Sequence, residues 1–364
     1  MAKQNRLRRA KMNTTRLLVS GIICLIAISI TPVNAQQAQK PIELKISSMA
    51  PRNMPVMLAF EAWGKEIEKR TIGRVKCEFY WSESLLKTAD AFKGTGAGLA
   101  DVCVDVAAYH PSDTPFATVS DLGYITNQVD ATARALTYLY GESPLFRNQF
   151  ERHNVKVMFF VPFPPNLIGS VKPIQKMEDL KGKKIRAIGW LNEVMAKLGA
   201  TPLAIPVPEI YESLSRKVID GYTGNILSAL RGWKLDEVAP YILDFGYGSY
   251  TNQIICMNKG KWDSLPPDIR KIIEEINSKG VDIYAEVYKN EEPRFVAPLK
   301  EKCKFYTLPS DEAARWKNQV IPDIWNTWVE KNKQYGPAQE FFNRYLELVK
   351  KYEPQSTYVN LFPR

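Results

Sequence analysis

The alternation of apolar strands with amphipathic helices is the feature that most limits how this chain can fold. Strands joined through helices in a β-α-β-α-β order form a mostly parallel sheet with helices on both of its faces. In the first part of the chain the pattern predicts strands over 42–49, 74–81, 100–109 and 154–163, and helices over 57–71, 85–98 and 131–141.

The same alternation starts again in the middle of the chain, where it predicts a second α/β unit. Its expected strands cover 183–189, 201–207 and 218–224, and its expected helices cover 192–199 and 208–217. A strand over 250–259 is expected to return to the first unit, and helices are expected over 266–292, 311–332 and 337–352.

Two α/β units with more than one crossing of the chain are typical of a hinged binding protein. We predict an α/β, two-lobed, periplasmic-binding-protein-like fold, with a mixed, mostly parallel sheet in each lobe, hinge strands and long C-terminal helices. Lobe I would comprise residues 41–161 plus 251–290, and lobe II residues 162–250 plus 291–364. A ligand would bind between the lobes, at the carboxyl ends of the strands.

Residues 1–35 have the pattern of an export signal. A basic segment precedes the apolar run Leu17–Ile30, and Val33-Asn34-Ala35 fits a cleavage site with small residues. The alternative is a membrane anchor, but the run is shorter than the roughly 20 residues that a spanning helix needs. Met12 is an alternative start. We therefore expect a soluble mature protein in the periplasm.

Charge and composition argue against nucleic-acid binding. The formal net charge is +10, but six of the 49 basic residues and none of the 39 acidic ones lie in the predicted signal. The mature chain would carry 43 basic and 39 acidic residues, a net charge of +4. No basic stripe with interleaved aromatic residues is present, as a nucleic-acid binder would need.

Few residues suited to catalysis or metal binding remain. Cys77, Cys103, Cys256 and Cys303 form no CxxC motif, and buried free thiols or one disulfide are both compatible with their positions. The mature chain would hold only His110 and His153, and it has no HExxH or GxSxG motif. We expect no enzyme, no cofactor and no metal site.

The segment from Asp179 to Asn225 resembles the solute-binding proteins of tripartite ATP-independent periplasmic (TRAP) transporters, of the C4-dicarboxylate-receptor type. The matching motifs in it are Asp179-Leu180-Lys181-Gly182, Lys184-Ile185-Arg186, Leu198-Gly199-Ala200, Glu209-Ile210-Tyr211, Val218-Ile219-Asp220-Gly221 and Asn225. Segments outside it, at Ile46–Pro51, Gly98–Val104, Tyr109–Phe116 and Met257–Pro266, are also similar to the family. The resemblance covers nearly all of the mature chain.

The resemblance implies that Arg186 binds a ligand carboxylate and that Asn225 adds a hydrogen bond. A guanidinium suits this role, because it is planar, always charged and offers two parallel donors. The alternative for Arg186 is a structural ion pair with Asp179 or Glu178, and Asn225 could instead be a turn residue after Gly224.

The chain departs from the family where many members carry a second Arg, because Asn166 stands there. We therefore expect a monocarboxylate, or a ligand whose far end is neutral, with Asn166 as a further contact. Aromatic residues near the expected strand ends suggest apolar walls for an aromatic or branched aliphatic acid, although each could be an ordinary packing residue. They are Tyr80, Trp81, Tyr109, Trp190, Tyr222 and Trp233.

The resemblance also implies the partners of the protein. It would act as a monomer that delivers its carboxylate to the integral membrane subunits of a TRAP-type transporter. A carboxylate-binding protein that serves a sensor or another class of importer remains an alternative, and a secreted enzyme is a more distant one.

Overall fold

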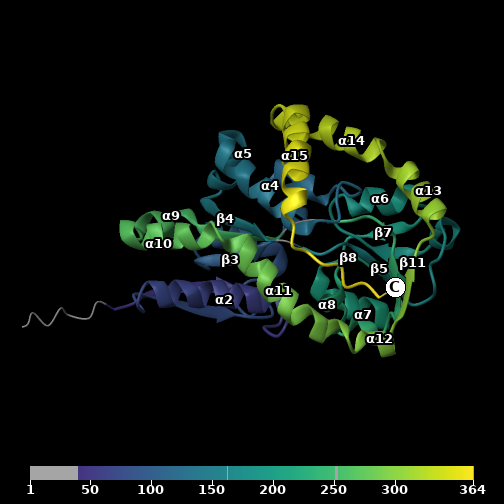
Figure 1. Ribbon diagram of the computed structural model, residues 1–364, viewed down its shortest axis with the longest axis horizontal. Coiled ribbons are helices and arrows are strands. Elements are labelled where there is room, and N and C mark those ends of the chain that lie inside the picture. Colours follow the sequence, from purple (N-terminus) through teal and green to yellow (C-terminus); the bar gives the residue numbers. More distant parts are fainter. Residues whose placement is uncertain (1–39, 162, 251–252, 364) are drawn as a thin grey trace, which may run out of the picture. The chain divides into compact units, whose positions relative to one another are not determined.

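The structure is a computed structural model that describes residues 40–161, 163–250 and 253–363. The chain divides into the units Met1–Pro41 and Ile42–Arg364, and all elements below belong to the second unit (Figure 1). The predicted signal peptide and Cys24 lie outside the described residues.

The first sheet contains five strands in the order β2-β1-β3-β10-β4. The strand β1 is parallel to both β2 and β3, whereas β10 is antiparallel to β3 and to β4. Four strands therefore run in one direction, and only β10 runs against them. The bounds are β1 (Ile42–Ser47), β2 (Val75–Tyr80), β3 (Val102–Asp105), β4 (Val155–Val161) and β10 (Gln253–Asn258).

The second sheet has six strands in the order β11-β9-β5-β8-β6-β7. Here β5 is the one strand antiparallel to its neighbours β8 and β9, and the other pairs are parallel. Both sheets are thus mixed and mostly parallel, as predicted. The bounds are β5 (Leu167–Ser170), β6 (Lys184–Arg186), β7 (Thr201–Leu203), β8 (Gly221–Asn225), β9 (Tyr241–Asp244) and β11 (Lys304–Thr307).

The helices follow the predicted pattern, with corrections. The first part of the chain has α2 (Pro55–Arg70), α3 (Ala91–Gly96), α4 (Val129–Glu142) and α5 (Pro144–Glu151). The middle part has α6 (Leu191–Lys197), α7 (Ile210–Ser215) and α8 (Leu227–Gly232). The last part has α9 (Lys259–Ser264), α10 (Pro267–Asn277), α11 (Gly280–Val296), α12 (Leu299–Lys302), α13 (Ser310–Val320), α14 (Asp323–Asn332) and α15 (Ala338–Tyr352).

Three predicted elements were wrong in extent. The helix expected over 311–332 is split into α13 and α14 at Pro322, because proline lacks the amide proton that a helix interior needs. The helix expected over 266–292 is likewise two helices, α10 and α11. The third strand ends at Asp105, and Ala107–Tyr109 form a 3-10 turn. Apolar composition alone cannot distinguish a buried turn from a buried strand.

The chain passes from the first sheet to the second between β4 and β5, and it returns between β9 and β10. As predicted, β10 belongs to the first sheet. One of the later helices, α11, then contacts elements of both sheet regions. The helix α11 packs on α2, β4 and α8, and α15 lies along α4 (Figure 1). The division into two lobes at the expected boundaries stays a proposal.

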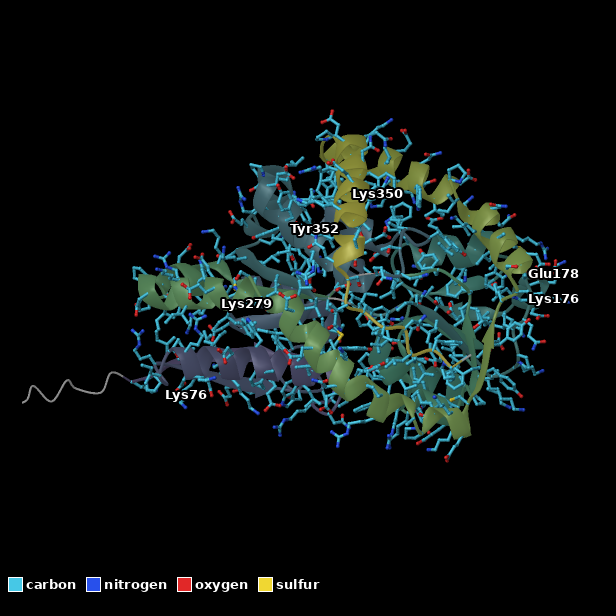
Figure 2. All side chains as sticks on the ribbon, in the orientation of Figure 1. Lys76, Lys176, Glu178, Lys279, Lys350 and Tyr352 are labelled. Carbon is cyan, nitrogen blue, oxygen red and sulfur yellow. The ribbon has the colours of Figure 1, made fainter. Side chains whose placement is uncertain are left out.

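The remaining features of the fold are its exposed lysines, the character of its helices and its cysteine thiols. Exposed lysines such as Lys76, Lys279 and Lys350 lie on separate elements (Figure 2). Within the described ranges, none of the helices combines the length and the apolar character that crossing a membrane requires. All four cysteines of the predicted mature chain are free thiols, although Cys103 and Cys256 face each other across β3 and β10.

Candidate ligand-binding site

Arg186 is the last residue of β6, and it has no exposed surface. Its Nε donates to the backbone oxygen of Ile205 at 2.7 Å, and its Nη1 donates to that of Thr223 at 2.9 Å. Its Nη2 lies 3.4 Å from the hydroxyl oxygen of Tyr109. All three acceptors are neutral, so they orient the guanidinium without balancing its charge.

Within the described part of the chain, no carboxylate forms an ion pair with Arg186. Glu178 instead binds Arg315, whose guanidinium lowers the pKa of that carboxyl to about 2. Asp179 accepts hydrogen bonds from the backbone of Gln175 and Lys176. The structural alternative considered for Arg186 therefore finds no support in the geometry. A buried charge without a partner is costly, and no carboxylate among the described residues forms an ion pair that would offset this cost.

A cavity with an empty volume of about 520 Å³ is lined by Gly224, and we call it the inner cavity; Arg186 itself is not among its described lining residues. A side chain on Gly224, which lines it, would place its Cβ only 3.0 Å from Arg186 Nη1, so the guanidinium sits directly behind this glycine. The walls are largely apolar and include Met49, Met54, Phe163, Trp233 and Tyr250.

Two amide side chains that line the inner cavity have a buried atom without a partner. They are Nδ2 of Asn225, at the end of β8, and Oε1 of Gln253, at the start of β10. Both side chains are almost fully buried, with 3% and 5% of their surface exposed. Buried polar atoms are nearly always hydrogen-bonded in folded proteins, so both are free to bind a ligand.

A second, larger pocket, the outer pocket, lies beside the inner cavity, with an empty volume of about 1060 Å³. Tyr109 and Ile188 line both spaces, so these two side chains form the wall between them. On the far side of the outer pocket, Lys331 Nζ contacts Glu193 Oε1 at 2.9 Å and lies 5.1 Å from the ring centre of Trp190.

Asn166 lies behind the site and lines neither space. It is buried, its Nδ2 donates to Thr223 Oγ1 at 2.8 Å, and its Oδ1 accepts from the backbone nitrogen of Gly224 at 2.6 Å. Because the carbonyl of Thr223 accepts from Arg186, Asn166 holds the stretch of β8 that orients the guanidinium.

The remaining predicted residues separate into two groups. Trp233 lines the inner cavity, Trp190 lines the outer pocket, and Tyr109 lines both. Three others line neither: Tyr80 ends β2, Trp81 stacks on Phe79, and Tyr222 is fully buried against Gly169.

Sequence reasoning missed Gln253 and Tyr250, which lie where the chain returns to the first sheet. The hydroxyl of Tyr250 donates to the backbone oxygen of Ile188 at 3.0 Å, and burial raises the pKa of this tyrosine well above its ordinary value. A glutamine that opens the apolar run of β10 was the available signal, since an amide in such a run needs a partner.

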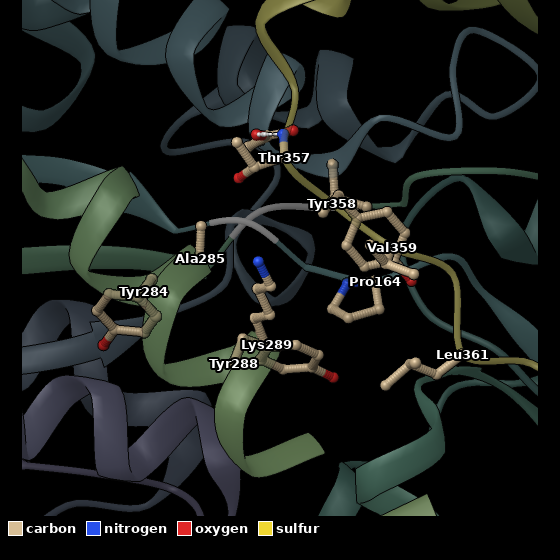
Figure 3. Close-up of a pocket in the computed structure, with 11 residues that line it drawn as sticks. Pro164, Tyr284, Ala285, Tyr288, Lys289, Thr357, Tyr358, Val359 and Leu361 are labelled. Carbon is tan, nitrogen blue, oxygen red and sulfur yellow. Dashed lines mark hydrogen bonds between the residues drawn. The ribbon is translucent and has the colours of Figure 1, made fainter. Parts of the chain in front are cut away.

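Cavity size does not by itself select the site. Another cavity of about 520 Å³ lies between α11 and the C-terminal segment, where Tyr288 and Lys289 face Tyr358 and Pro164 (Figure 3). Among its described lining residues the one with a positive charge is Lys289, whereas the inner cavity has the buried Arg186 directly behind its lining residue Gly224. The uncompensated charge of Arg186 and the amides beside it distinguish the inner cavity.

The two mixed sheets with their covering helices define a class of protein, the two-lobed receptors that bind a small solute. The chain belongs to the bacterial extracellular solute-binding proteins of family 7, whose profile matches residues 46–331. This membership confirms the predicted class and the predicted location in the periplasm.

Individual relatives agree with this assignment. The C4-dicarboxylate-binding periplasmic protein DctP of Rhodobacter capsulatus is 24% identical, over 85% of this chain and 92% of its own. A TRAP periplasmic solute-binding protein from Desulfovibrio salexigens is 26% identical, with a TM-score of 0.72, over 89% of this chain and 99% of its own. A TRAP solute-binding protein from Rhodoferax ferrireducens, solved with copurified benzoate, is similar in fold at 23% identity, with a TM-score of 0.77, over 86% and 99%.

Proposed function

We propose that this protein captures a small monocarboxylate on Arg186 and delivers it to the membrane subunits of a TRAP-type secondary transporter. The observation that carries the proposal is the fully buried guanidinium of Arg186, which has only neutral partners and lies against a cavity. Closure around the ligand would be driven by contacts that are stronger in the closed form than in the open one.

The hydrogen-bonding capacity of Arg186 supports a two-oxygen ligand. A guanidinium has five N–H groups, and three are used by Ile205, Thr223 and Tyr109. One N–H remains on each Nη, and this pair can donate to the two oxygens of one carboxylate. Nδ2 of Asn225, which has no partner, can add a third hydrogen bond.

The charge of the cavity supports one carboxylate and not two. Among the described residues that line the inner cavity there is no Lys, Arg or His, so Arg186, which lies behind Gly224, is the one cation that we assign to the ligand. Asn166 also stands where the family resemblance leads us to expect a second arginine in many members. Lys331 of the outer pocket already pairs with Glu193. The aromatic and thioether walls suit an aromatic or branched aliphatic body.

We also infer that the protein binds the acid without changing it. Among the described residues that line the inner cavity there is no Ser, Cys, His, Asp or Glu that could act on the proposed ligand as a nucleophile or general base. The buried His110 instead pairs with Asp105 at 2.7 Å. Catalytic turnover of a bound acid would contradict this inference.

Replacing Arg186 with methionine tests the proposal directly. We expect the Arg186→Met variant to lose about 3 kcal/mol or more of binding free energy, more than about a hundredfold in Kd, because a buried carboxylate would lose its charged partner. Titration calorimetry against phenylacetate, 3-phenylpropionate, 4-methylpentanoate and succinate would measure this loss.

The matched control is Arg216→Met, which removes the same charge from a side chain that is 74% exposed and paired with Glu212. This variant should bind as the wild type does. Unchanged affinity in Arg186→Met would refute the site, and tighter binding of succinate than of every monocarboxylate would refute the one-cation pocket. Uptake by cells or vesicles with and without the membrane subunits would distinguish a transporter receptor from a sensor component.

A further inference from the structure

Gln253 contributes a hydrogen-bond acceptor to the inner cavity that the binding of a carboxylate does not use. Its Oε1 is buried without a partner, and only 5% of the residue is exposed. A carboxylate has no proton to donate, so it cannot satisfy this oxygen. A buried carbonyl left unsatisfied is costly, and a ligand with a donor would recover that cost.

The two unpartnered amides come from different sheets. Asn225 ends β8 of the second sheet beside Arg186, whereas Gln253 opens β10 of the first sheet, opposite Val161 of β4. A ligand that places its carboxylate on Arg186 and a donor on Gln253 would therefore contact both sheets. Such contacts favour a closed form, because they can all be made only when the two sheet regions enclose the ligand.

The chemistry of the cavity limits what the donor can be. An ammonium group would place a positive charge beside Gln253, and none of the described lining residues is a carboxylate that could balance it. The hydroxyl of Tyr250 already donates to Ile188, so it is not available to Gln253. A ligand hydroxyl is neutral, and it can donate to Gln253 while also accepting from a neighbouring group.

We propose that Gln253 recognises a hydroxyl group of the bound acid, so that the receptor prefers hydroxy acids to the matching acids without the hydroxyl. This inference rests on the proposed function, because it assumes that the carboxylate occupies Arg186. It makes Gln253 a residue that determines specificity, and it narrows the ligand class from monocarboxylates to monohydroxy monocarboxylates.

The test compares matched acids on the whole mature protein. We would measure Kd by titration calorimetry for 3-phenyllactate against 3-phenylpropionate, and for 3- and 4-hydroxyphenylacetate against phenylacetate. In the wild type at least one hydroxy acid should bind about tenfold more tightly than its parent, as one satisfied buried hydrogen bond would give. Gln253→Met has a similar volume and no amide, and it should reduce this preference to less than about threefold.

Controls separate this inference from the proposed function. Gln175→Met, at an exposed position, should keep the wild-type preference. Arg186→Met should lose the hydroxy acids and their parents alike. Melting temperatures of all variants would show that they are folded.

Each result has a defined meaning. If acids bind through Arg186 but no hydroxy acid is preferred, or if Gln253→Met keeps the preference, the inference about Gln253 is wrong and the proposed function stands. Tighter binding of phenylpyruvate than of phenyllactate would also overturn it, because the amide would then be donating to a ligand carbonyl. If no acid binds the wild type at all, the proposed function itself fails.

Discussion

Arg186 and Glu292 are both buried ionisable side chains, and burial affects the charge of each one differently. Arg186 has no exposed surface and remains charged, because arginine does not lose its proton in proteins. Glu292, with 2% of its surface exposed, can instead hold its proton, and burial raises its pKa to about 7. In the proposed complex the ligand carboxylate balances the charge of the arginine, whereas the charge of the glutamate depends on pH.

Glu292 should make the stability of the protein fall as the pH rises. Its carboxyl ionises near 4.5 in the unfolded chain and near 7 in the folded one, mainly because burial disfavours the charged form. Between these values the folded state binds more protons, so the free energy of unfolding decreases by up to about 3 kcal/mol towards pH 8. Glu292→Gln should therefore stabilise the protein at pH 8 and have little effect at pH 4.5.

Urea unfolding at the two pH values would measure this difference. The exposed Glu301→Gln is the control, and it should change the stability by less than about 0.5 kcal/mol at either pH. A stabilisation by Glu292→Gln that is equal at pH 4.5 and pH 8 would contradict the assignment of the pH dependence to this carboxyl.

At the scale of single elements, β8 does most to organise the site. Its residue Thr223 orients Arg186 through a carbonyl, Gly224 brings the backbone close to the guanidinium, and Asn225 presents an amide to the inner cavity. Asn166, next to β5, holds the same stretch through hydrogen bonds to Thr223 and Gly224. Three consecutive residues of β8 thus position both the guanidinium of Arg186 and the amide of Asn225.

Gly224→Ala should weaken both folding and binding. Gly224 has a φ of +81°, so an alanine there would cost about 1–2 kcal/mol of unfolding free energy. The added methyl group would also lie 3.0 Å from Arg186 Nη1 and displace the guanidinium, which should lower ligand affinity. Chemical denaturation and calorimetry would measure the two effects separately.

Gly246→Ala is a close control for this variant. Gly246 has a similar φ of +73°, but a methyl group there would meet no atom within 4 Å. It should lose comparable stability and keep full ligand affinity. Equal affinities in the two variants would show that close approach at Gly224 does not matter for binding.

At the scale of the whole described unit, the C-terminal segment connects elements that are distant in sequence. The backbone nitrogen of Thr357 donates to Asp130 of α4 at 2.9 Å, and the ring of Phe362 packs edge-on against Phe305 of β11 at 5.3 Å (Figure 3 shows the Thr357 end). The segment therefore contacts a helix beside the first sheet and an edge strand of the second.

Phe362→Ala should destabilise the protein by about 3 kcal/mol, because it empties a buried aromatic position in the cluster around Leu299 and Val296. Val359→Ala, in the same segment but at a residue that is 59% exposed, should have an effect below about 0.5 kcal/mol. Urea unfolding of both variants would check this, and similar losses in the two would show that the segment is not anchored through Phe362.

The sequence by itself determined the alternating elements, the two mixed sheets and the return of β10, because these follow from local periodicity and from the short list of ways to pack strands and helices. With the family resemblance it also indicated Arg186 and Asn225. The local sequence pattern was not sufficient to predict the short strands β5, β9 and β11, nor the turn that carries Tyr109.

Only the tertiary structure decided which polar groups lack a partner. Tyr222 and Asn225 belong to one strand, yet the first packs on Gly169 and the second lines the inner cavity, since side chains of a strand point to alternating faces and bends change which face they meet. The absence of an ion pair to Arg186 among the described residues, and the placement of Gln253 and Asn225 around one cavity, depend on segments far apart in the chain. Burial is a property of those contacts, and no local run of residues encodes it.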